Sequence, residues 1–303
     1  MSPALRRRSS AVSSRPSDSV RLAIPNKGRI AQPVRELIEK SGLHIVEGNE
    51  RRLIARTLDP HVEVIFSRPA DIPEYVADGV ADVGVTGHDM VMERGSLVEE
   101  LLDLQIGRAV LVLAVPEDAT FEQVRELDGA RVATEFPGIT RAYFERHATS
   151  VHIIPVGGAC EAAPQLGIAD AIVDLSSSGD TLRTNHLRVV EEVLVTSTML
   201  IGNISAIRQK GEKIGEIRLA LESVIRAKGQ KYIMMNVPRS SLGDVKNVLP
   251  GLGGPTVMDV ASAENLVAVH AVVGEERIFS LITQLRKAGA RDILVVPIER
   301  MVR

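Results

Sequence analysis

The chain has 303 residues, of which 45% are apolar and 25% charged, and its formal net charge is −3. This composition is typical of a globular protein with two or three domains, and the small net charge and 3% aromatic content argue against nucleic-acid binding. No apolar run approaches the roughly 20 residues of a membrane helix, so we expect neither a membrane protein nor a secreted binding protein. The single cysteine, Cys160, excludes an internal disulfide and a cysteine-rich zinc site, and it favours a reducing, cytoplasmic location.

Residues 1–20 are rich in arginine and serine and have no apolar periodicity. This pattern predicts a disordered tail. An organelle-targeting peptide is the less favoured alternative, because such peptides are also rich in arginine and serine and poor in acidic residues.

After the tail, short apolar runs alternate with amphipathic stretches, which is the pattern of an α/β protein. Residues 21–25 predict a buried strand, which a turn at Asn26-Lys27-Gly28 joins to a helix. A glycine turn between a strand and a helix presents backbone N–H groups to an anion. Further strands are expected at 62–66, 81–86 and 110–115, one helix is expected to start with Asp71 as its N-cap, and another is expected after Gly87.

A second lobe is predicted to follow Pro116, beginning with a glutamate-rich helix and continuing with strands at 131–134, 152–155 and 171–174. Residues 189–197 lead back towards the first lobe. Two lobes joined by crossing strands leave a cleft, and small ligands usually bind at such domain junctions.

The last part of the chain has a self-contained order after a charged helix at 211–228. Strands and helices are expected in the order βαββαβ, which is that of the ferredoxin-like unit, at 232–237, 240–248, 256–260, 266–273, 275–288 and 293–297. The predicted fold is therefore α/β, with a two-lobed core like that of periplasmic binding proteins and a C-terminal ferredoxin-like, ACT-like domain. The expected boundaries are a tail at 1–20, a first lobe at 21–112 and 190–228, a second lobe at 113–189 and the last domain at 229–303.

The most informative segment runs from Glu161 to Leu182. The strand at 171–173 delivers Asp174 at its carboxyl end, where α/β proteins collect functional groups. A serine- and glycine-rich loop then enters a helix, and its hydroxyls and free N–H groups make a cradle for phosphate. Asp174 is placed to accept hydrogen bonds from ribose hydroxyls or to bind Mg²⁺. Taken alone, such a loop is more often a simple helix cap.

The whole segment resembles the signature of the ATP phosphoribosyltransferase family, which opens histidine biosynthesis. Four other segments resemble motifs of the same family in the same order, namely Pro25–Gly28, Arg68–Pro73, Asp82–Gly87 and Arg131–Pro137. With the βαββαβ unit, the resemblance to the long form of the enzyme covers residues 21–303.

This resemblance implies a transfer of phosphoribosyl from phosphoribosyl pyrophosphate to N1 of ATP, with release of pyrophosphate and with Mg²⁺ as cofactor. It also implies feedback inhibition by histidine and a homo-oligomer, with dimers assembled into a hexamer. The adenine N1 has no proton to remove, so no Ser-His-Asp base is expected.

The resemblance also implies roles for particular residues. Lys27, Glu161 and Asp174 are expected to be catalytic, with Glu161 and Asp174 facing the ribose hydroxyls. The same two acids are the expected protein ligands of the metal. The 5-phosphate is expected at Ser176, Ser177, Ser178, Gly179, Asp180 and Thr181. ATP and pyrophosphate are expected at Lys27, Gly28, Arg68, Asp71, Gly87 and Asp89.

Histidine is expected in the last domain, at Asn236, Thr256 and Ala271. An asparagine at 236 departs from an acid in some relatives, and it removes a charge partner for the amino group of histidine. Two isolated residues are interpreted more simply: His88 as a solvated loop histidine and Cys160 as a small buried thiol rather than a nucleophile.

Two other hypotheses remain open. One is a non-catalytic, two-lobed protein that binds or senses a small molecule, which is expected to carry a signal peptide or a helix-turn-helix. The other is a catalytically idle regulatory subunit, which is expected to have lost the phosphate loop that this chain retains.

Overall fold

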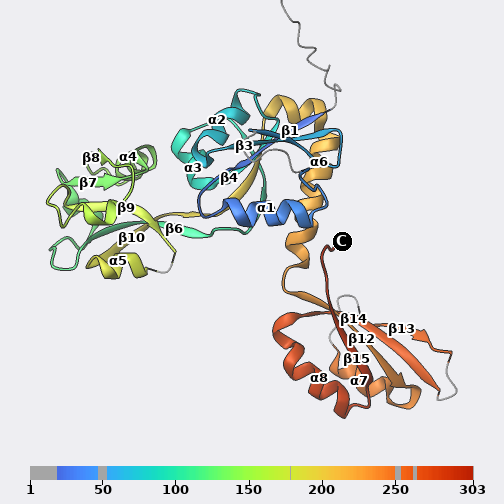
Figure 1. Ribbon diagram of the computed structural model, residues 1–303. Helices are drawn as coiled ribbons and strands as arrows, with labels where there is room; N and C mark the ends of the chain where they lie inside the picture. Colours follow the sequence, from blue (N-terminus) through green and yellow to red (C-terminus); the bar gives the residue numbers. More distant parts are fainter. Residues whose placement is uncertain (1–18, 47–52, 178, 250–253, 262–264, 303) are drawn as a thin grey trace, which may run out of the picture. The chain divides into compact units, whose positions relative to one another are not determined.

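The computed structural model describes residues 19–46, 53–177, 179–249, 254–261 and 265–302 (Figure 1). The chain divides into two compact units. Unit 1 takes in Met1–Val34 and Ile45–Ile217, and unit 2 takes in Arg35–His44 and Arg218–Arg303. The domain boundaries expected from the sequence stay a prediction.

The first sheet of unit 1 has six strands in the order β2-β3-β1-β4-β11-β5. Strands β1, β3 and β4 are parallel, and β11 runs antiparallel to β4 and β5. We call this sheet, with helices α2 and α3, lobe I. Its strands are β1 (Val20–Pro25), β2 (Ile54–Arg56), β3 (Val62–Ser67), β4 (Val83–Gly87), β5 (Glu99–Asp103) and β11 (Thr198–Gly202), and its helices are α2 (Ile72–Ala77) and α3 (His88–Arg94). Helix α1 (Ala31–Lys40) follows the turn after β1.

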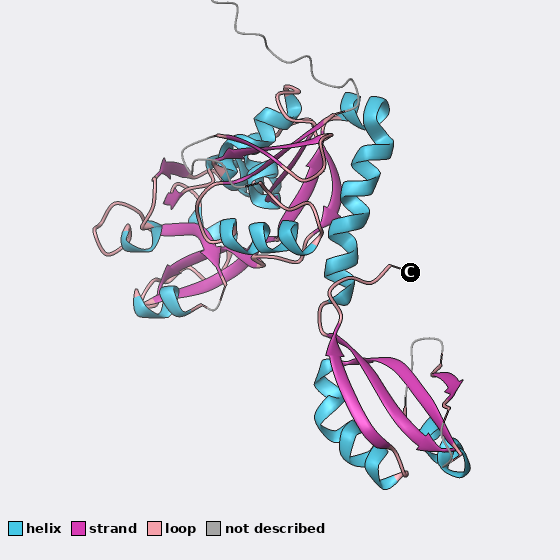
Figure 2. Ribbon diagram, turned by 45° about the vertical axis from the view of Figure 1, so that its right-hand side comes forward, coloured by secondary structure: helices cyan, strands magenta, loops and turns pink. Residues whose placement is uncertain are grey.

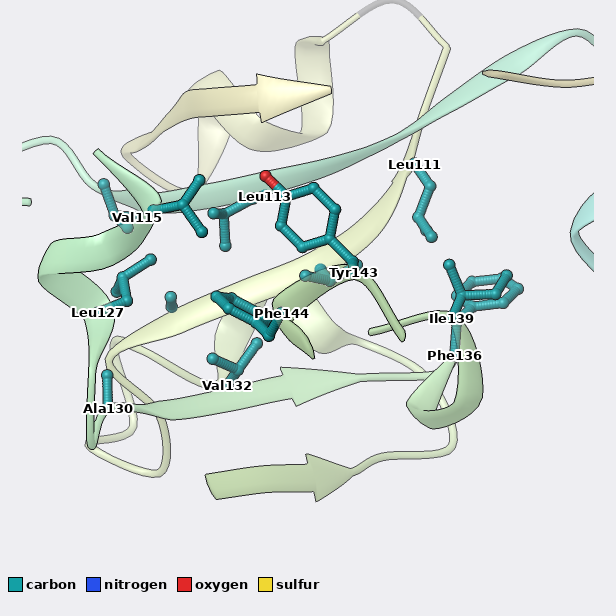
Figure 3. Packing of buried hydrophobic residues seen from close by; sticks show 13 residues of the cluster. Leu111, Leu113, Val115, Leu127, Ala130, Val132, Phe136, Ile139, Tyr143 and Phe144 are labelled. Carbon is teal, nitrogen blue, oxygen red and sulfur yellow. The ribbon is translucent and has the colours of Figure 1, made fainter. Parts of the chain in front are cut away.

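The second sheet of unit 1 has five strands in the order β10-β6-β9-β7-β8. We call it, with helices α4 and α5, lobe II. Figure 3 shows its core, in which Phe136, Tyr143 and Phe144 pack against strand residues such as Leu113 and Val132. Its strands are β6 (Ala109–Pro116), β7 (Arg131–Thr134), β8 (His152–Pro155), β9 (Ala171–Ser176) and β10 (Leu187–Thr196), and its helices are α4 (Pro137–Arg146) and α5 (Asp180–Thr184).

The chain passes between the two lobes twice, after β5 and after β10. The two passages are hydrogen-bonded to each other, because the Leu104 N–H donates to the Thr198 carbonyl and the Thr198 N–H to the Ile106 carbonyl, both at 2.9 Å. This arrangement confirms the α/β class and the two-lobed core.

Unit 2 holds a four-stranded antiparallel sheet in the order β13-β14-β12-β15, with its strands in magenta and helices in cyan in Figure 2. Alternate residues of β14 are buried, and helices α7 and α8 contribute to the same core cluster, so they cover one face of the sheet. The βαββαβ prediction is confirmed, with β12 (Gln230–Pro238), α7 (Leu242–Val248), β13 (Thr256–Asp259), β14 (Leu266–Gly274), α8 (Ile278–Lys287) and β15 (Arg291–Pro297).

Helix α6 (Ile204–Ala227) is longer than the predicted helix at 211–228. Lys210 interrupts it with a non-helical backbone (φ −125°, ψ 25°). The Lys210 ammonium donates to the Asp82 carboxylate at 2.7 Å and to the Ser19 carbonyl at 2.9 Å. A largely buried ion pair with lobe I therefore lies at the kink.

The prediction of a glutamate-rich helix after Pro116 is wrong, because only a short 3₁₀ turn forms there, at Val124–Leu127. Two contacts explain the difference. The Arg188 guanidinium binds the carbonyls of Ala119 and Phe121, at 3.0 and 2.6 Å, which a helix would need for its own hydrogen bonds. The short strands β2, β5 and β11 were not expected from the sequence.

The predicted tail lies outside the described residues as far as residue 18. Ser19 and Val20, which belonged to that prediction, are buried instead, and Val20 opens β1. Among the described residues, none of the helices combines the length and the apolar character that crossing a membrane requires.

Candidate functional site

A pocket of about 250 Å³ lies in lobe II where β9 ends and α5 begins. It brings together six of the residues predicted to bind the phosphoribosyl group or to act in catalysis. Ser178 lies outside the described residues, and the Asp180 carboxylate pairs with Arg183 rather than lining the pocket. The lining residues are Glu161, Asp174, Leu175, Ser176, Ser177, Gly179, Thr181 and Leu182.

Gly179 makes the turn from strand to helix possible. It has a φ of 76° and precedes α5 as its N-cap, without a side-chain cap bond. Glycine adopts this left-handed conformation without the steric cost of a Cβ. The hydroxyls of Ser176, Ser177 and Thr181 are thereby gathered around one small space, which suits a bound oxyanion.

Asp174 is half-buried beside two other acids. Its Oδ1 accepts a hydrogen bond from the Leu175 N–H at 2.7 Å. Burial, with smaller contributions from the negative charges of Glu161 and Glu135, raises the pKa of Asp174 to about 6. The ionised form of Asp174 is therefore disfavoured in the free protein, and a bound cation or hydrogen-bond donor would stabilise it.

Glu135 was missed as a site residue, although it lies in one of the quoted motifs. Strands β7 and β9 are parallel and paired, with Thr134 opposite Val173. The residues that follow these two, Glu135 and Asp174, therefore stand next to each other at the same edge of the sheet. Strand pairing, which the sequence alone did not establish, was the missing signal.

The acids of this pocket fit the donor set of Mg²⁺. Magnesium is usually held by one or two carboxylates together with substrate phosphates and water. Glu161 and Asp174 line one pocket and repel each other, so a divalent cation would relieve the repulsion. The described residues contain no group of three or more histidine, cysteine or acidic side chains arranged for a metal, so the site does not form a closed protein cage.

The predicted ATP and pyrophosphate residues of lobe I gather at the carboxyl ends of β1, β3 and β4. Lys27 is exposed, and Gly28 has a φ of 88°. The Asn26 N–H donates to the Ser67 carbonyl at 2.8 Å, which holds this turn next to Arg68.

The end of β4 joins the same group. The Thr86 hydroxyl donates to the Pro69 carbonyl at 2.8 Å, so Gly87 follows directly beside the loop of Arg68. Asp71 precedes α2 as predicted, but its side chain makes no cap hydrogen bond.

Asp89 differs from the other predicted residues because its side chain is already engaged. It is 7% exposed, and its Oδ1 accepts a hydrogen bond from the Thr196 hydroxyl at 2.9 Å. The Asp89 N–H donates back to that hydroxyl at 3.1 Å. The structure thus places Asp89 at the junction of α3 with the end of β10.

The two isolated residues have clear environments. Cys160 is buried and its thiol donates to the Ala133 carbonyl at 3.1 Å, while burial raises the thiol pKa. The prediction of a buried structural thiol is confirmed. His88 does not lie in a solvated loop, since it opens α3 and its Nδ1 is 2.6 Å from the Glu100 carboxylate.

A second pocket of interest, of about 280 Å³, lies on the sheet face of unit 2 that α7 and α8 leave open. The Asn236 amide lines it and donates to the Asp292 carboxylate at 2.9 Å. Thr256 is exposed on β13, opposite His270. The Ala271 side chain is not brought to this face, because it is 5% exposed and lies in the core on the other side. The lining residues are Met234, Met235, Asn236, Ala268, His270, Asp292 and Leu294.

The fold and this arrangement of residues define a two-lobed α/β protein with an appended small α/β domain. Comparison with known families narrows this class. The family model described as ATP phosphoribosyltransferase matches residues 68–223, and the model described as the C-terminal domain of HisG matches residues 227–300. The chain therefore belongs to the ATP phosphoribosyltransferase family, and it is an enzyme of the pentosyltransferase class.

Individual relatives agree with the family models. The chain is 55% identical over 288 residues to an ATP phosphoribosyltransferase of Methanosarcina mazei, with 93% of this chain and 99% of the relative covered. It is 54% identical, with the same coverage, to one of Methanosarcina barkeri. Among solved structures, it resembles the ATP phosphoribosyl transferase (HisG:HisZ) complex from Thermotoga maritima, with a TM-score of 0.61, 30% identity, and coverage of 68% of this chain and 98% of that one.

Proposed function

We propose that this enzyme transfers the phosphoribosyl group of phosphoribosyl pyrophosphate to N1 of ATP, which forms N1-(5-phosphoribosyl)-ATP and pyrophosphate. This reaction is the first step of histidine biosynthesis, to which the named relatives point. The observation that carries the proposal is the pocket in which Asp174 and Glu161 adjoin the hydroxyls of Ser176, Ser177 and Thr181. A phosphorylated ribose needs hydroxyl groups that bind its phosphate and carboxylates that accept hydrogen bonds from its own hydroxyls.

The 5-phosphate is proposed to bind the turn between β9 and α5, where three hydroxyls and a glycine allow close backbone approach. Asp174 and Glu161 would then accept hydrogen bonds from the ribose hydroxyls. Binding of these hydroxyls favours the ionised form of Asp174, which burial disfavours in the free enzyme.

The transfer breaks the bond between C1 of the ribose and the pyrophosphate oxygen, and it forms a bond between C1 and N1 of adenine. The electron pair of the broken bond leaves with pyrophosphate, so no proton has to move. Lys27 is proposed to neutralise the departing pyrophosphate with its ammonium group, next to Gly28 and Arg68. Asp71, Gly87 and Asp89 complete the proposed nucleotide side, with Asp89 acting through its bond to Thr196.

Mg²⁺ is the proposed cofactor, and it would supply positive charge to the pyrophosphate. Glu161 and Asp174 are the protein groups proposed to hold it together with the substrate. The remaining work of the protein is to hold two polyanions in line.

Histidine is proposed to inhibit the enzyme by binding the open-face pocket of unit 2. Asn236 supplies no negative charge there, but Asp292 lies 2.9 Å from its amide and lines the same pocket. We therefore propose Asp292 as the partner of the amino group of histidine, with Asn236 and Thr256 as neutral partners. A cytoplasmic homo-oligomer, with dimers assembled into a hexamer, completes the proposal.

The function is tested by assaying the purified chain with ATP, phosphoribosyl pyrophosphate and Mg²⁺. Lys27→Met is expected to lower kcat/KM on the order of 100-fold, because a charge that stabilises the leaving group is lost. The matched control is Lys40→Met, which removes an exposed lysine from the last turn of α1. Equal losses in the two variants would contradict the role of Lys27. A non-catalytic binding protein, the alternative hypothesis, would form no product at all.

A further inference from the structure

Helix α4 of lobe II begins without a cap from its own sequence. Phe136, which precedes it, makes no side-chain cap bond, and Pro137 has no N–H to donate. The N–H groups of Gly138 and Ile139 donate instead to the two carboxylate oxygens of Glu93, each at 2.9 Å. Glu93 belongs to α3 of lobe I. A carboxylate from one lobe therefore caps a helix of the other, where the positive end of the helix dipole favours negative charge.

The two helices also approach each other closely. A Cβ on Gly138 would lie 2.9 Å from the Glu93 carbonyl oxygen, so only glycine permits this contact without a shift. Met90, which lies on α3, packs against the core cluster of lobe II. Charge, hydrogen bonds and apolar packing thus act together at the joint between α3 and α4.

Both helices start at groups of the proposed site. Helix α3 follows Gly87, at the lobe I edge that carries Lys27 and Arg68. Helix α4 follows β7 and Glu135, beside Asp174. The joint therefore connects the two sets of residues that the proposed reaction must bring together.

We propose that Glu93 is a positioning residue of the transferase, which by capping α4 sets the position of Asp174 and the hydroxyl turn relative to Lys27. This inference rests on the proposed function, because the transfer requires both lobes at once. Glu93 acts through α4 rather than on the substrates. A misplacement of reacting groups by about 1 Å can cost on the order of 100-fold in rate.

Two substitutions test the joint from its two sides. Glu93→Gln replaces one of the two accepting oxygens by an NH2 group, which cannot accept a hydrogen bond from α4. Gly138→Ala inserts a methyl group into the contact. Each is expected to lower kcat/KM on the order of 10- to 100-fold. Because both act on one contact, the double variant is expected to lose little more than either single variant. Glu74→Gln is the matched control, since Glu74 pairs with Arg94 of α3 at 3.1 Å inside lobe I.

A distance measurement separates this inference from the proposed function. Asp78 of lobe I and Glu145 of lobe II are exposed, so each is replaced by cysteine and spin-labelled, while Cys160 is buried and escapes labelling. Without substrates, Glu93→Gln and Gly138→Ala are expected to shift or broaden the distance distribution, and Glu74→Gln to leave it unchanged.

Distances that neither variant changes would overturn the inference, as would changed distances with full activity in both variants. An inactive starting enzyme would contradict the proposed function instead, and the distances alone would still decide whether Glu93 sets the position of the lobes.

Discussion

At the residue scale, the main electrostatic feature of the candidate site is the raised pKa of Asp174. Burial raises its pKa to about 6, and the charges of Glu161 and Glu135 add to that effect. Asp174 was expected from the sequence because it lies within one contiguous motif. Glu135 and Glu93 were not, because each meets its partner only through folding, Glu93 across 45 residues of chain.

Replacing Glu135 by glutamine should move the pH profile of the reaction. Removal of the Glu135 charge lowers the pKa of Asp174, so Asp174 ionises at lower pH. The acid limb of kcat/KM for phosphoribosyl pyrophosphate is therefore expected to shift to lower pH. The control, Glu145→Gln on the exposed side of α4, should leave the profile in place. An unmoved limb in Glu135→Gln would contradict the electrostatic role of Glu135.

Replacing Asp174 by asparagine should separate stability from activity. The folded-state pKa of about 6 exceeds the unfolded value of 3.8, so the wild type loses stability as pH rises through this range. Asp174→Asn has no such loss. The difference in melting temperature between Asp174→Asn and the wild type should therefore grow in favour of the variant as the pH rises through this range, and it should stay constant at higher pH. The turnover of the variant should fall on the order of 100-fold. The measurement is thermal unfolding across pH. A constant difference at all pH values would show that Asp174 is not strained by burial.

At the element scale, the turn from β9 into α5 depends on one glycine. Gly179→Ala should cost about 1–2 kcal/mol of stability, because a side chain disfavours the left-handed conformation at a φ of 76°. It should also raise the KM for phosphoribosyl pyrophosphate, since the turn lines the pocket.

Gly167 offers a matched control for this turn. It has a φ of 69°, a Cβ there would meet no atom within 4 Å, and it does not line the pocket. Gly167→Ala should lower stability by a similar amount while leaving the KM unchanged. A raised KM in both variants would mean that the effect is general destabilisation.

Some elements could be predicted from local sequence patterns, and others could not. Strands β7 and β8 have the predicted bounds, because short apolar runs between turn residues leave little choice. The helix predicted after Pro116 failed because Arg188, on β10, takes carbonyls that the helix needs. A tertiary contact from 67 residues away is not visible in a local pattern.

At the scale of the whole molecule, regulation should depend on unit 2. Asp292→Asn is expected to weaken inhibition by histidine about tenfold or more, because the proposed pocket loses the negative charge that pairs with an amino group. Catalysis without histidine should be unchanged. Inhibition curves of the two proteins provide the measurement, and an unchanged inhibition constant would remove Asp292 from the proposed site.

The small net charge of the whole chain bears on how the proposed substrates bind. A formal charge of −3 provides no general attraction for two polyanionic substrates. The proposed reaction therefore depends on local groups, namely the hydroxyl turn in lobe II, Lys27 in lobe I and the magnesium that accompanies pyrophosphate.

The most direct test of this account is the formation of phosphoribosyl-ATP by the full chain, followed by the absorbance of the product. With ATP, phosphoribosyl pyrophosphate and Mg²⁺, the wild type is expected to form one product and one pyrophosphate per turnover, and Asp174→Asn is expected to be folded but nearly inactive. A folded wild type that forms no product, or an Asp174→Asn variant with full activity, would contradict it.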